Sequence, residues 1–268
     1  MMRRSPKLMV VGLGVLFAVA LAASPALAFS LTGNYFTLSS GHPDVQSGID
    51  NATVTGLVLP AISGVPGTAA AAPLVSGVPA PVSGAITDTS GGAIQWWTAH
   101  GGIVSVDTSI GAGTGIRVDS SVLVGNANVL GGTAFASNFF AGGAASDGGA
   151  NGFRAVHFTG SLAITPATVL TLSADDDAWL FLNGNLVLDN GGVKALSLAT
   201  TSSVTGLAAG NYTVDLFFAD RNTVQSGIAF SVIDPVPEPA TLLLFGTTLA
   251  GLGAMIRRRL KGQPVSEV

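Results

Sequence analysis

Trp179-Leu180-Phe181-Leu182-Asn183-Gly184-Asn185-Leu186-Val187-Leu188 places an Asn-Gly pair between two apolar runs. Asn and Gly both accept positive φ angles, so this pair is typical of a two-residue type I′ turn between antiparallel strands. The sequence therefore predicts a β-hairpin over residues 179–188, with its turn at Asn183 and Gly184.

Strand-like segments flank this hairpin on both sides. They are short and separated by Gly, Asn and Asp, a pattern typical of a β-sandwich or jelly roll. The predicted strands lie at 103–106, 116–124, 155–164, 169–173, 212–218 and 228–233, and 31–58 is strand-like with Gly-rich breaks. The uncharged segment 61–85 is rich in Ala, Gly and Pro. It is a flexible linker, a long surface loop or a set of irregular extended strands.

The composition of residues 29–235 also favours strands. This span carries thirteen Asp, no Glu and only four basic residues, a net charge of −9 against −4 for the whole chain. Glu and Lys favour helices, whereas Asp, Asn and Gly favour turns and Thr and Val favour strands. So acidic a domain is not expected to bind nucleic acid, which requires Lys and Arg. The chain has no Cys, which excludes disulfides and thiolate metal sites. We predict one all-β domain.

The N-terminal 28 residues have the layout of a secretory signal peptide. Arg3, Arg4 and Lys7 precede an apolar stretch at 8–23, and a small-x-small cleavage site follows at 26–28. We therefore expect the Sec machinery to export the domain at 29–235.

The C-terminal segment has three parts in a fixed order. Pro237-Glu238-Pro239 comes first, followed by an uncharged apolar run at 240–256 and the basic cluster Arg257-Arg258-Arg259. About 17 apolar residues at 1.5 Å rise give roughly 25 Å, which suits a short transmembrane helix. The basic cluster holds that end in the cytoplasm, and residues 262–268 form a tail. An ordinary C-terminal membrane anchor is the alternative.

Residues 236–261 closely resemble the PEP-CTERM sorting signal of Gram-negative bacteria. The resemblance implies that an exosortase in the inner membrane recognises Pro237-Glu238-Pro239 and processes the tail. The protein would be anchored in that membrane for a time and then reach the cell surface or the exopolysaccharide matrix.

Asp175-Asp176-Asp177 is the one dense group of ionisable residues. It ends a predicted strand and precedes the hairpin, so we expect it at one edge of the sandwich. Adjacent carboxylates repel one another, and hard oxygen ligands of this kind suit calcium. Asn183 and Asp189 are further candidate ligands, although turn chemistry explains both equally well. In the alternative interpretation, the three Asp residues are solvated turn formers.

Residues 174–193, which include this cluster and the hairpin, closely resemble the core signature of the fibro-slime domain. That family is related to the protective-antigen-type, lectin-like β-sandwich. Similar motifs in the same order cover roughly residues 32–233: His42-Pro43-Asp44, Gln95-Trp96-Trp97, Val156-His157-Phe158-Thr159, Leu216–Asn222 and Ser226–Phe230. Two positions differ from the family, because Lys194 replaces the usual His and Asp220 replaces the usual Glu.

The resemblance also implies a site. In the related lectin-like sandwiches, two neighbouring Asp residues joined by a cis peptide, with an Asn from another loop, hold a calcium ion that binds sugar hydroxyls. Asp175 and Asp176 would be that pair here. Independently of the resemblance, we expect Asp220-Arg221 to pair with partners inside the sandwich, in a structural role.

Aromatic residues and histidines are weaker candidates. Trp96 and Trp97 are adjacent, so in a strand one of them would be exposed and able to stack on a sugar. Trp179 alternates with apolar residues and is expected in the core. His42, His100 and His157 show no metal-ligand spacing, so we expect surface or strand positions.

The sequence favours a non-enzymatic surface or matrix protein with a structural or adhesive role in extracellular polysaccharide or biofilm. A calcium-dependent carbohydrate-binding module with a specific glycan is the alternative. A glycoside-acting enzyme is a remote third, since it would need two carboxyl groups about 5 to 10 Å apart, and no motif singles out such a pair.

Overall fold

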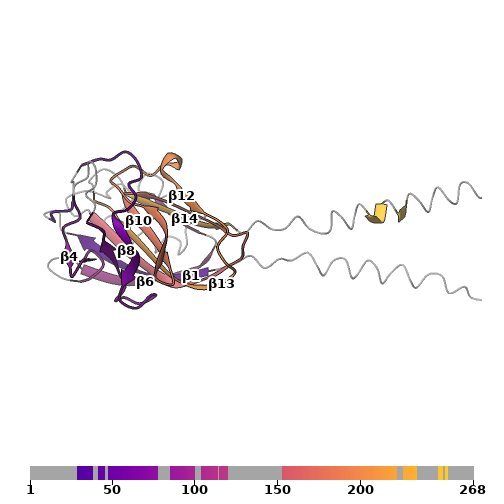
Figure 1. Ribbon diagram of the computed structural model, residues 1–268, viewed down its shortest axis with the longest axis horizontal. Helices are drawn as coiled ribbons and strands as arrows, with labels where there is room; N and C mark the ends of the chain where they lie inside the picture. Colours follow the sequence, from indigo (N-terminus) through magenta and orange to yellow (C-terminus); the bar gives the residue numbers. More distant parts are fainter. Residues whose placement is uncertain are drawn as a thin grey trace, which may run out of the picture. The chain divides into compact units, whose positions relative to one another are not determined.

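The structure is a computed structural model of the 268-residue chain. It describes residues 29–38, 42–45, 48–77, 85–99, 104–113, 115–119, 153–221, 226–233, 247–249 and 251–252. The chain divides into two compact units, Leu27–Asp234 and the two terminal segments together. The first unit contains every named strand and is an all-β sandwich, as the sequence predicts (Figure 1).

The predicted targeting segments lie largely outside the described residues. The signal peptide at 1–28, the Pro237-Glu238-Pro239 triplet and Arg257-Arg258-Arg259 are all in this group. Residues 247–249 and 251–252 are helical. Within the part of the chain that the structure describes, no helix is both long and apolar enough to cross a membrane.

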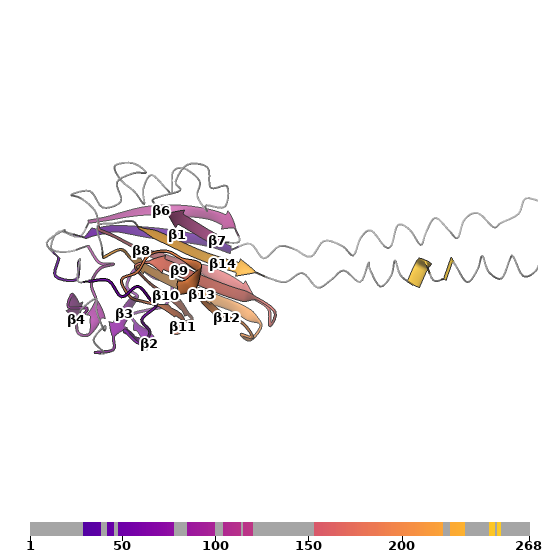
Figure 2. The same cartoon turned by 90° about the horizontal axis from the view of Figure 1, so that it is seen from above.

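Two antiparallel sheets form the sandwich. The larger sheet contains, in spatial order, β4 (Thr89–Ser90), β5 (Ala93–Ile94), β3 (Ala72–Val75), β2 (Val58–Ser63), β11 (Asn185–Asn190), β10 (Asp177–Leu182), β13 (Gly210–Ala219), β8 (Phe153–Ile164), β1 (Phe29–Leu38) and β6 (Val104–Gly113). The smaller sheet contains β12 (Ser202–Val204), β9 (Val169–Asp175), β14 (Gly227–Ile233) and β7 (Gly115–Asp119). A short 3₁₀ helix, η1 (Leu198–Thr200), precedes β12. In Figure 2, β6 and the group β2–β4 lie on opposite sides of the domain.

The main core fills the space between the two sheets. Successive side chains of a strand point to opposite faces, so every second residue of β8, β10 and β13 faces this core. Phe158, Leu180 and Leu216 come from the larger sheet, and Leu172 and Phe230 come from the smaller one. All five are buried, so the sandwich has a continuous apolar interior.

A second core lies on the other face of the larger sheet. Trp179, Phe181 and Phe217 point to this face, and they pack against Trp96 and Trp97. The covering layer comes from the segments between residues 42 and 99. Because both faces of β10 are covered, all of its residues are buried. Central strands of this kind consist almost entirely of apolar residues, which explains why the apolar runs of the predicted hairpin at 179–188 are so clear in the sequence.

The structure confirms the predicted hairpin. Asn183 and Gly184 have φ angles of 50° and 78°, and Leu182 pairs with Asn185 across the turn. The strands predicted at 155–164, 169–173, 212–218 and 228–233 are β8, β9, β13 and β14.

The segments before residue 120 follow the predictions in part. Residues 58–63 and 72–75 are strands, and the described residues between them are turns and irregular structure, so this part of 61–85 combines extended strands with a loop. The span 31–58 is predicted to be strand-like with Gly-rich breaks, and within it β1 ends at Leu38. The described residues that follow are turns and irregular structure as far as Val58, apart from one bridge between Val54 and Gly191.

Candidate metal site where the chain crosses between sheets

The Asp175–Asp177 segment carries the chain from one sheet to the other. Asp175 ends β9 in the smaller sheet, Asp177 begins β10 in the larger sheet, and Asp176 lies between them. The peptide bond between Asp175 and Asp176 is cis. Asp175, Asp176 and Asp177 are 6%, 1% and 0% exposed. The alternative interpretation of these residues as solvated turn formers is therefore wrong.

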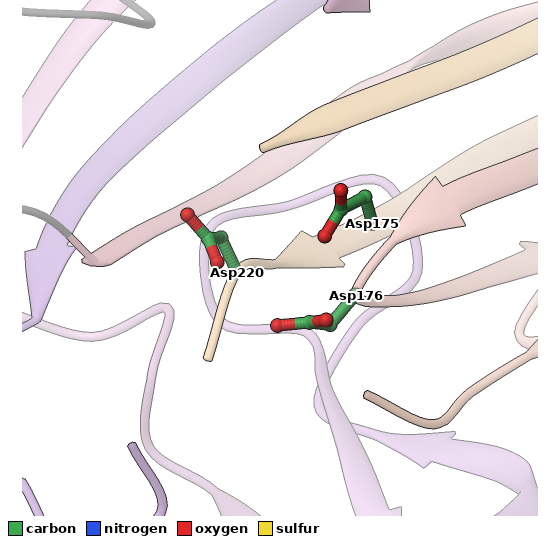
Figure 3. A group of neighbouring side chains, drawn as sticks. All are labelled: Asp175, Asp176 and Asp220. Atoms are coloured by element: carbon green, nitrogen blue, oxygen red, sulfur yellow. The ribbon is translucent and has the colours of Figure 1, made fainter. Parts of the chain in front are cut away.

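Two of these carboxylates meet a third from another strand. Asp220 directly follows β13, and one oxygen each from Asp175, Asp176 and Asp220 lies within 4.8 Å of the others. Figure 3 shows the three side chains around a common space. All three are buried. Three carboxylates at this spacing form a donor set that fits a hard cation such as calcium.

Asp177 is not part of this group, which corrects the prediction that it is a metal ligand. Its Oδ1 accepts a hydrogen bond from the Gly192 N–H at 2.7 Å, and its Oδ2 accepts one from Arg221 Nε at 2.7 Å. Successive side chains point in different directions where a strand begins, and this geometry separates Asp177 from Asp176. Arg221 does form a buried charge pair inside the sandwich, as expected, and its partner is Asp177.

Asn183 is also wrongly predicted as a ligand. It lies beyond the far end of β10, about 20 Å from Asp176 at the usual rise per strand residue. Its Oδ1 accepts a hydrogen bond from the Thr213 N–H at 2.8 Å, which is turn chemistry. Asp189 likewise accepts hydrogen bonds from the Gly56 N–H and from Trp179 Nε1, at 2.7 and 3.0 Å.

Asp220 is the residue that sequence reasoning missed. The sequence interpretation gives it only a structural role, as a charge that pairs with a partner inside the sandwich. The sequence does contain a signal, because β9 ends in Ala174-Asp175 and β13 ends in Ala219, which Asp220 directly follows. That the two Asp residues meet depends on how the strands are arranged in the sandwich, and spacing along the chain does not show this.

Backbone and side-chain donors hold Asp176 in place. Its Oδ1 accepts a hydrogen bond from the Lys194 N–H at 2.9 Å, and its Oδ2 accepts one from the Arg221 N–H at 2.7 Å. Lys194 Nζ donates to the main-chain oxygens of Asp176, Asn190 and Gly192, at 2.6, 2.9 and 3.1 Å.

Burial shifts the ionisation of both partners. It raises the pKa of Asp176 well above its usual value, and the neighbouring charges of Asp175 and Asp177 raise it further. Burial also lowers the pKa of Lys194 to about 8. A cation beside the carboxylates would oppose the shift of Asp176, because an opposite charge favours the ionised form.

Trp96 and Trp97 do not form an exposed sugar-stacking surface, which corrects that expectation. They are 0% and 2% exposed. They lie in a turn after β5 rather than in a strand, so the alternation assumed for them does not apply. Trp96 Nε1 donates to Asp44 Oδ2, and Trp97 Nε1 donates to the main-chain oxygens of Val156 and Phe218, each at 3.1 Å.

The histidines have structural partners. His157 lies on β8, as expected for a strand residue, with its Nε2 2.9 Å from Asp215 Oδ1 and its ring stacked on Phe217. His42 Nε2 lies 3.0 Å from Asp88 Oδ2. His100 lies outside the described residues.

Two protein-family models match this chain. Residues 138–239 match the PA14 domain. That match covers the sheet crossing, both Asp residues of the cis peptide, and Asp220. Residues 235–259 match the PEP-CTERM protein-sorting motif, which confirms the resemblance seen in the C-terminal segment. The chain is therefore similar to the PA14 domain over residues 138–239 and to the sorting motif over residues 235–259, and the two matches overlap at 235–239.

Curated relatives match over a short segment only. The proteins psiB, psiR and psiE of Dictyostelium discoideum are 47%, 40% and 42% identical to this chain over 62 residues. Those residues are 22% of this chain and 11%, 6% and 12% of the respective relatives. The chain thus corresponds to about a tenth of the length of these relatives.

Solved structures with a PA14 domain are similar to a larger part of the chain. The PA14 domain of the antifreeze protein MpAFP is 17% identical with a TM-score of 0.33, covering 81% of this chain and 88% of that one. The PA14 sugar-binding domain of an RTX adhesin is 16% identical with a TM-score of 0.35, covering 77% and 89%. A β-glucosidase of Kluyveromyces marxianus in complex with glucose is 17% identical with a TM-score of 0.25, covering 33% and 12%.

Proposed function

We propose that this chain is an exported, exosortase-sorted protein of the cell surface or extracellular matrix, whose PA14 domain binds carbohydrate with the help of calcium. The sorting motif at 235–259 supports the first part of this proposal. Sec export precedes sorting, and the inner membrane holds the chain until an exosortase processes it. An adhesive role in extracellular polysaccharide or biofilm follows from carbohydrate binding at that location.

The observation that carries the carbohydrate proposal is the group of three buried carboxylates inside the PA14 match. Asp175, Asp176 and Asp220 would hold the calcium ion. A bound calcium ion takes six to eight oxygen ligands, so it can also accept sugar hydroxyls. Asp175 is the least buried of the three, and we place the open side of the site next to it.

Sorting is tested by changing Pro237, Glu238 and Pro239 together to Ala in a host that has an exosortase. We expect the variant to remain in the inner-membrane fraction, whereas the wild-type chain reaches the surface or the medium. A matched control changes Gln263 and Pro264 to Ala in the tail. Normal export of the triple variant would contradict the sorting proposal.

Calcium binding is tested by thermal unfolding of the full chain in detergent, in EDTA and in calcium. Extracellular calcium modules bind with dissociation constants of about 10⁻⁴ to 10⁻³ M. At 10 to 100 times that concentration, binding stabilises the folded state by roughly 1 to 3 kcal/mol. We expect this gain to vanish in the double variant Asp175→Asn/Asp176→Asn.

The matched control is Asp189→Asn, the same chemical change outside the carboxylate group. It should retain the calcium-dependent gain. No gain in the wild-type chain would contradict the calcium site. If the gain appears, the same preparations can be tested on glycan arrays with calcium and with EDTA, and glycan binding should depend on calcium.

A further inference from the structure

Lys194 is a buried, positively charged residue next to the candidate calcium site, where it contacts the main chain of Asp176. It is the only Lys between residues 29 and 235, and its side chain is buried. An ammonium group has three N–H donors, and Nζ has three main-chain oxygens within hydrogen-bond distance. All three donors of Nζ are therefore used on main-chain carbonyl groups.

Lys194 contacts Asp176 at two points. Its Nζ donates to the Asp176 main-chain oxygen at 2.6 Å, and its own N–H donates to Asp176 Oδ1 at 2.9 Å. The other two acceptors of Nζ, the Asn190 and Gly192 carbonyls, lie where β11 ends. The ammonium thus joins the segment that crosses between the sheets to the segment that follows the hairpin. The ammonium thereby fixes the backbone of Asp176, from which its carboxylate projects, and the Lys194 N–H holds the carboxylate itself.

We propose that Lys194 is a positioning residue of the calcium site, which sets Asp176 at the place and angle that the cation requires. This inference rests on the calcium site proposed above. Residues that hydrogen-bond a metal ligand, without binding the metal themselves, typically contribute 10- to 100-fold to metal affinity. The direction of the change in calcium affinity distinguishes this role from a purely electrostatic one. A positive charge close to a calcium site repels the ion, so charge alone predicts tighter calcium binding when Lys194 is neutralised.

The experiment measures the dissociation constant of calcium by isothermal titration calorimetry on the full chain in detergent. For Lys194→Met, we expect calcium binding to be about 10- to 100-fold weaker than in the wild type. Binding that is unchanged or tighter would overturn the proposal, even if the variant melts at a lower temperature. A role limited to stability would lower the melting temperature and leave the dissociation constant the same.

A second variant covers the case in which Lys194→Met does not fold. The amide of Lys194→Gln is neutral and has two N–H donors for the three carbonyls, so we expect a smaller loss of affinity. Circular dichroism at the titration temperature checks the fold of each variant. If the wild-type chain itself binds no calcium, the proposed function fails; if it binds calcium and neither variant binds more weakly, only the role of Lys194 fails.

Discussion

Asp177 and Arg221 form a buried ion pair whose contribution to stability can be measured. Asp177 Oδ2 and Arg221 Nε are 2.7 Å apart, and both side chains are fully buried. Among the described residues, Nη1 and Nη2 of Arg221 have no hydrogen-bond partner. Removal of Asp177 would therefore leave the buried guanidinium without its ion-pair partner, with its contact to the Trp96 ring at 5.4 Å remaining. We expect Asp177→Ala to lower the free energy of unfolding by about 3–5 kcal/mol in urea titrations.

A double-mutant cycle controls this prediction. Asp177→Ala combined with Arg221→Met removes both charges, so the double variant should lose less stability than the two single variants added together. The main-chain N–H of Arg221 still donates to Asp176 in both backgrounds. Additive losses would mean that the pair contributes nothing beyond the separate side chains.

The ionisation of Asp189 should make the stability of the fold depend on pH. Burial raises the pKa of this carboxyl above its ordinary value, so the folded chain binds the proton more tightly than the unfolded chain. The contribution of Asp189 to stability is therefore full at low pH and is lost as pH rises through the raised pKa. An Asn at this position cannot ionise. We expect the stability of Asp189→Asn, relative to wild type, to increase from about pH 4 to about pH 7.

Urea titrations of both proteins at the two pH values provide the measurement. Asp189 accepts hydrogen bonds from the Gly56 N–H and from Trp179 Nε1. The Asn side chain has one acceptor oxygen instead of two, so the variant can lose one of these hydrogen bonds. The resulting loss of stability is the same at both pH values and cancels when the two values are compared. A relative stability that stays constant or decreases would contradict the prediction.

The sequence predicts which single residues carry charge, but it does not predict where their side chains point. Three adjacent Asp residues were a clear signal. Their division into Asp175 and Asp176 on one side and Asp177 on the other depends on the start of β10 in the larger sheet. Asp220 joins the group from a strand that is distant in sequence. The shared Ala-Asp pair at the ends of β9 and β13 is the one local signal, and it does not show that the two strands bring their Asp residues together.

At the level of elements, the hairpin turn tests how strictly the backbone requires glycine. Gly184 has φ of 78°, and a Cβ there would lie 3.0 Å from Pro66 Cγ. Gly206 has φ of 75° but nothing within 4 Å of its Cβ position. The left-handed conformation alone costs a non-glycine residue about 1–2 kcal/mol.

Gly206→Ala should therefore show the cost of the conformation alone, and Gly184→Ala should show an additional loss. We expect that additional loss to be at least about 1 kcal/mol, because Pro66 has to move to accommodate the new methyl group. Urea unfolding of the two variants gives the comparison. Equal losses would indicate that the β2–β3 turn adjusts to the turn of the hairpin without cost.

Elements with a strong local signal were predicted well, and those without one were not. The hairpin combines Asn-Gly with buried apolar runs, so both its turn and its strands could be predicted. The passage from β9 to β10 has no such signal, because a strand can continue in its own sheet or enter another with the same composition. The small strands β2 to β5 belong to a Gly- and Pro-rich region in which composition allows both loops and strands.

For the whole molecule, the main surprise is the third layer. The sequence predicts a two-layer sandwich, and in such a fold adjacent Trp residues would be divided between core and solvent. In the structure, segments between residues 42 and 99 cover the outer face of the larger sheet, and Trp96 and Trp97 both become core residues. The length of the chain permits such a layer, but only tertiary packing shows which face it covers.

Trp97 is the residue through which this layer is joined to the sandwich. Its ring centroid lies 4.9 Å from that of Phe217 and 6.2 Å from that of Trp179, and its Nε1 bonds two main-chain oxygens of the sheet. We expect Trp97→Ala to lower the free energy of unfolding by about 3–5 kcal/mol. The smaller change Trp97→Phe keeps a ring but loses the N–H donor, so it should cost less.

Both variants should still unfold in one transition. β8, β10 and β13 contribute side chains to both cores, so loss of the outer layer would expose one whole face of the central strands. Near-ultraviolet circular dichroism follows the remaining Trp96 and Trp179 in the outer core, and the far-ultraviolet signal follows the strands. In a two-state transition the two signals coincide. If the near-ultraviolet signal is lost first in Trp97→Ala, the outer layer is a separate unit that folds onto a sandwich already formed.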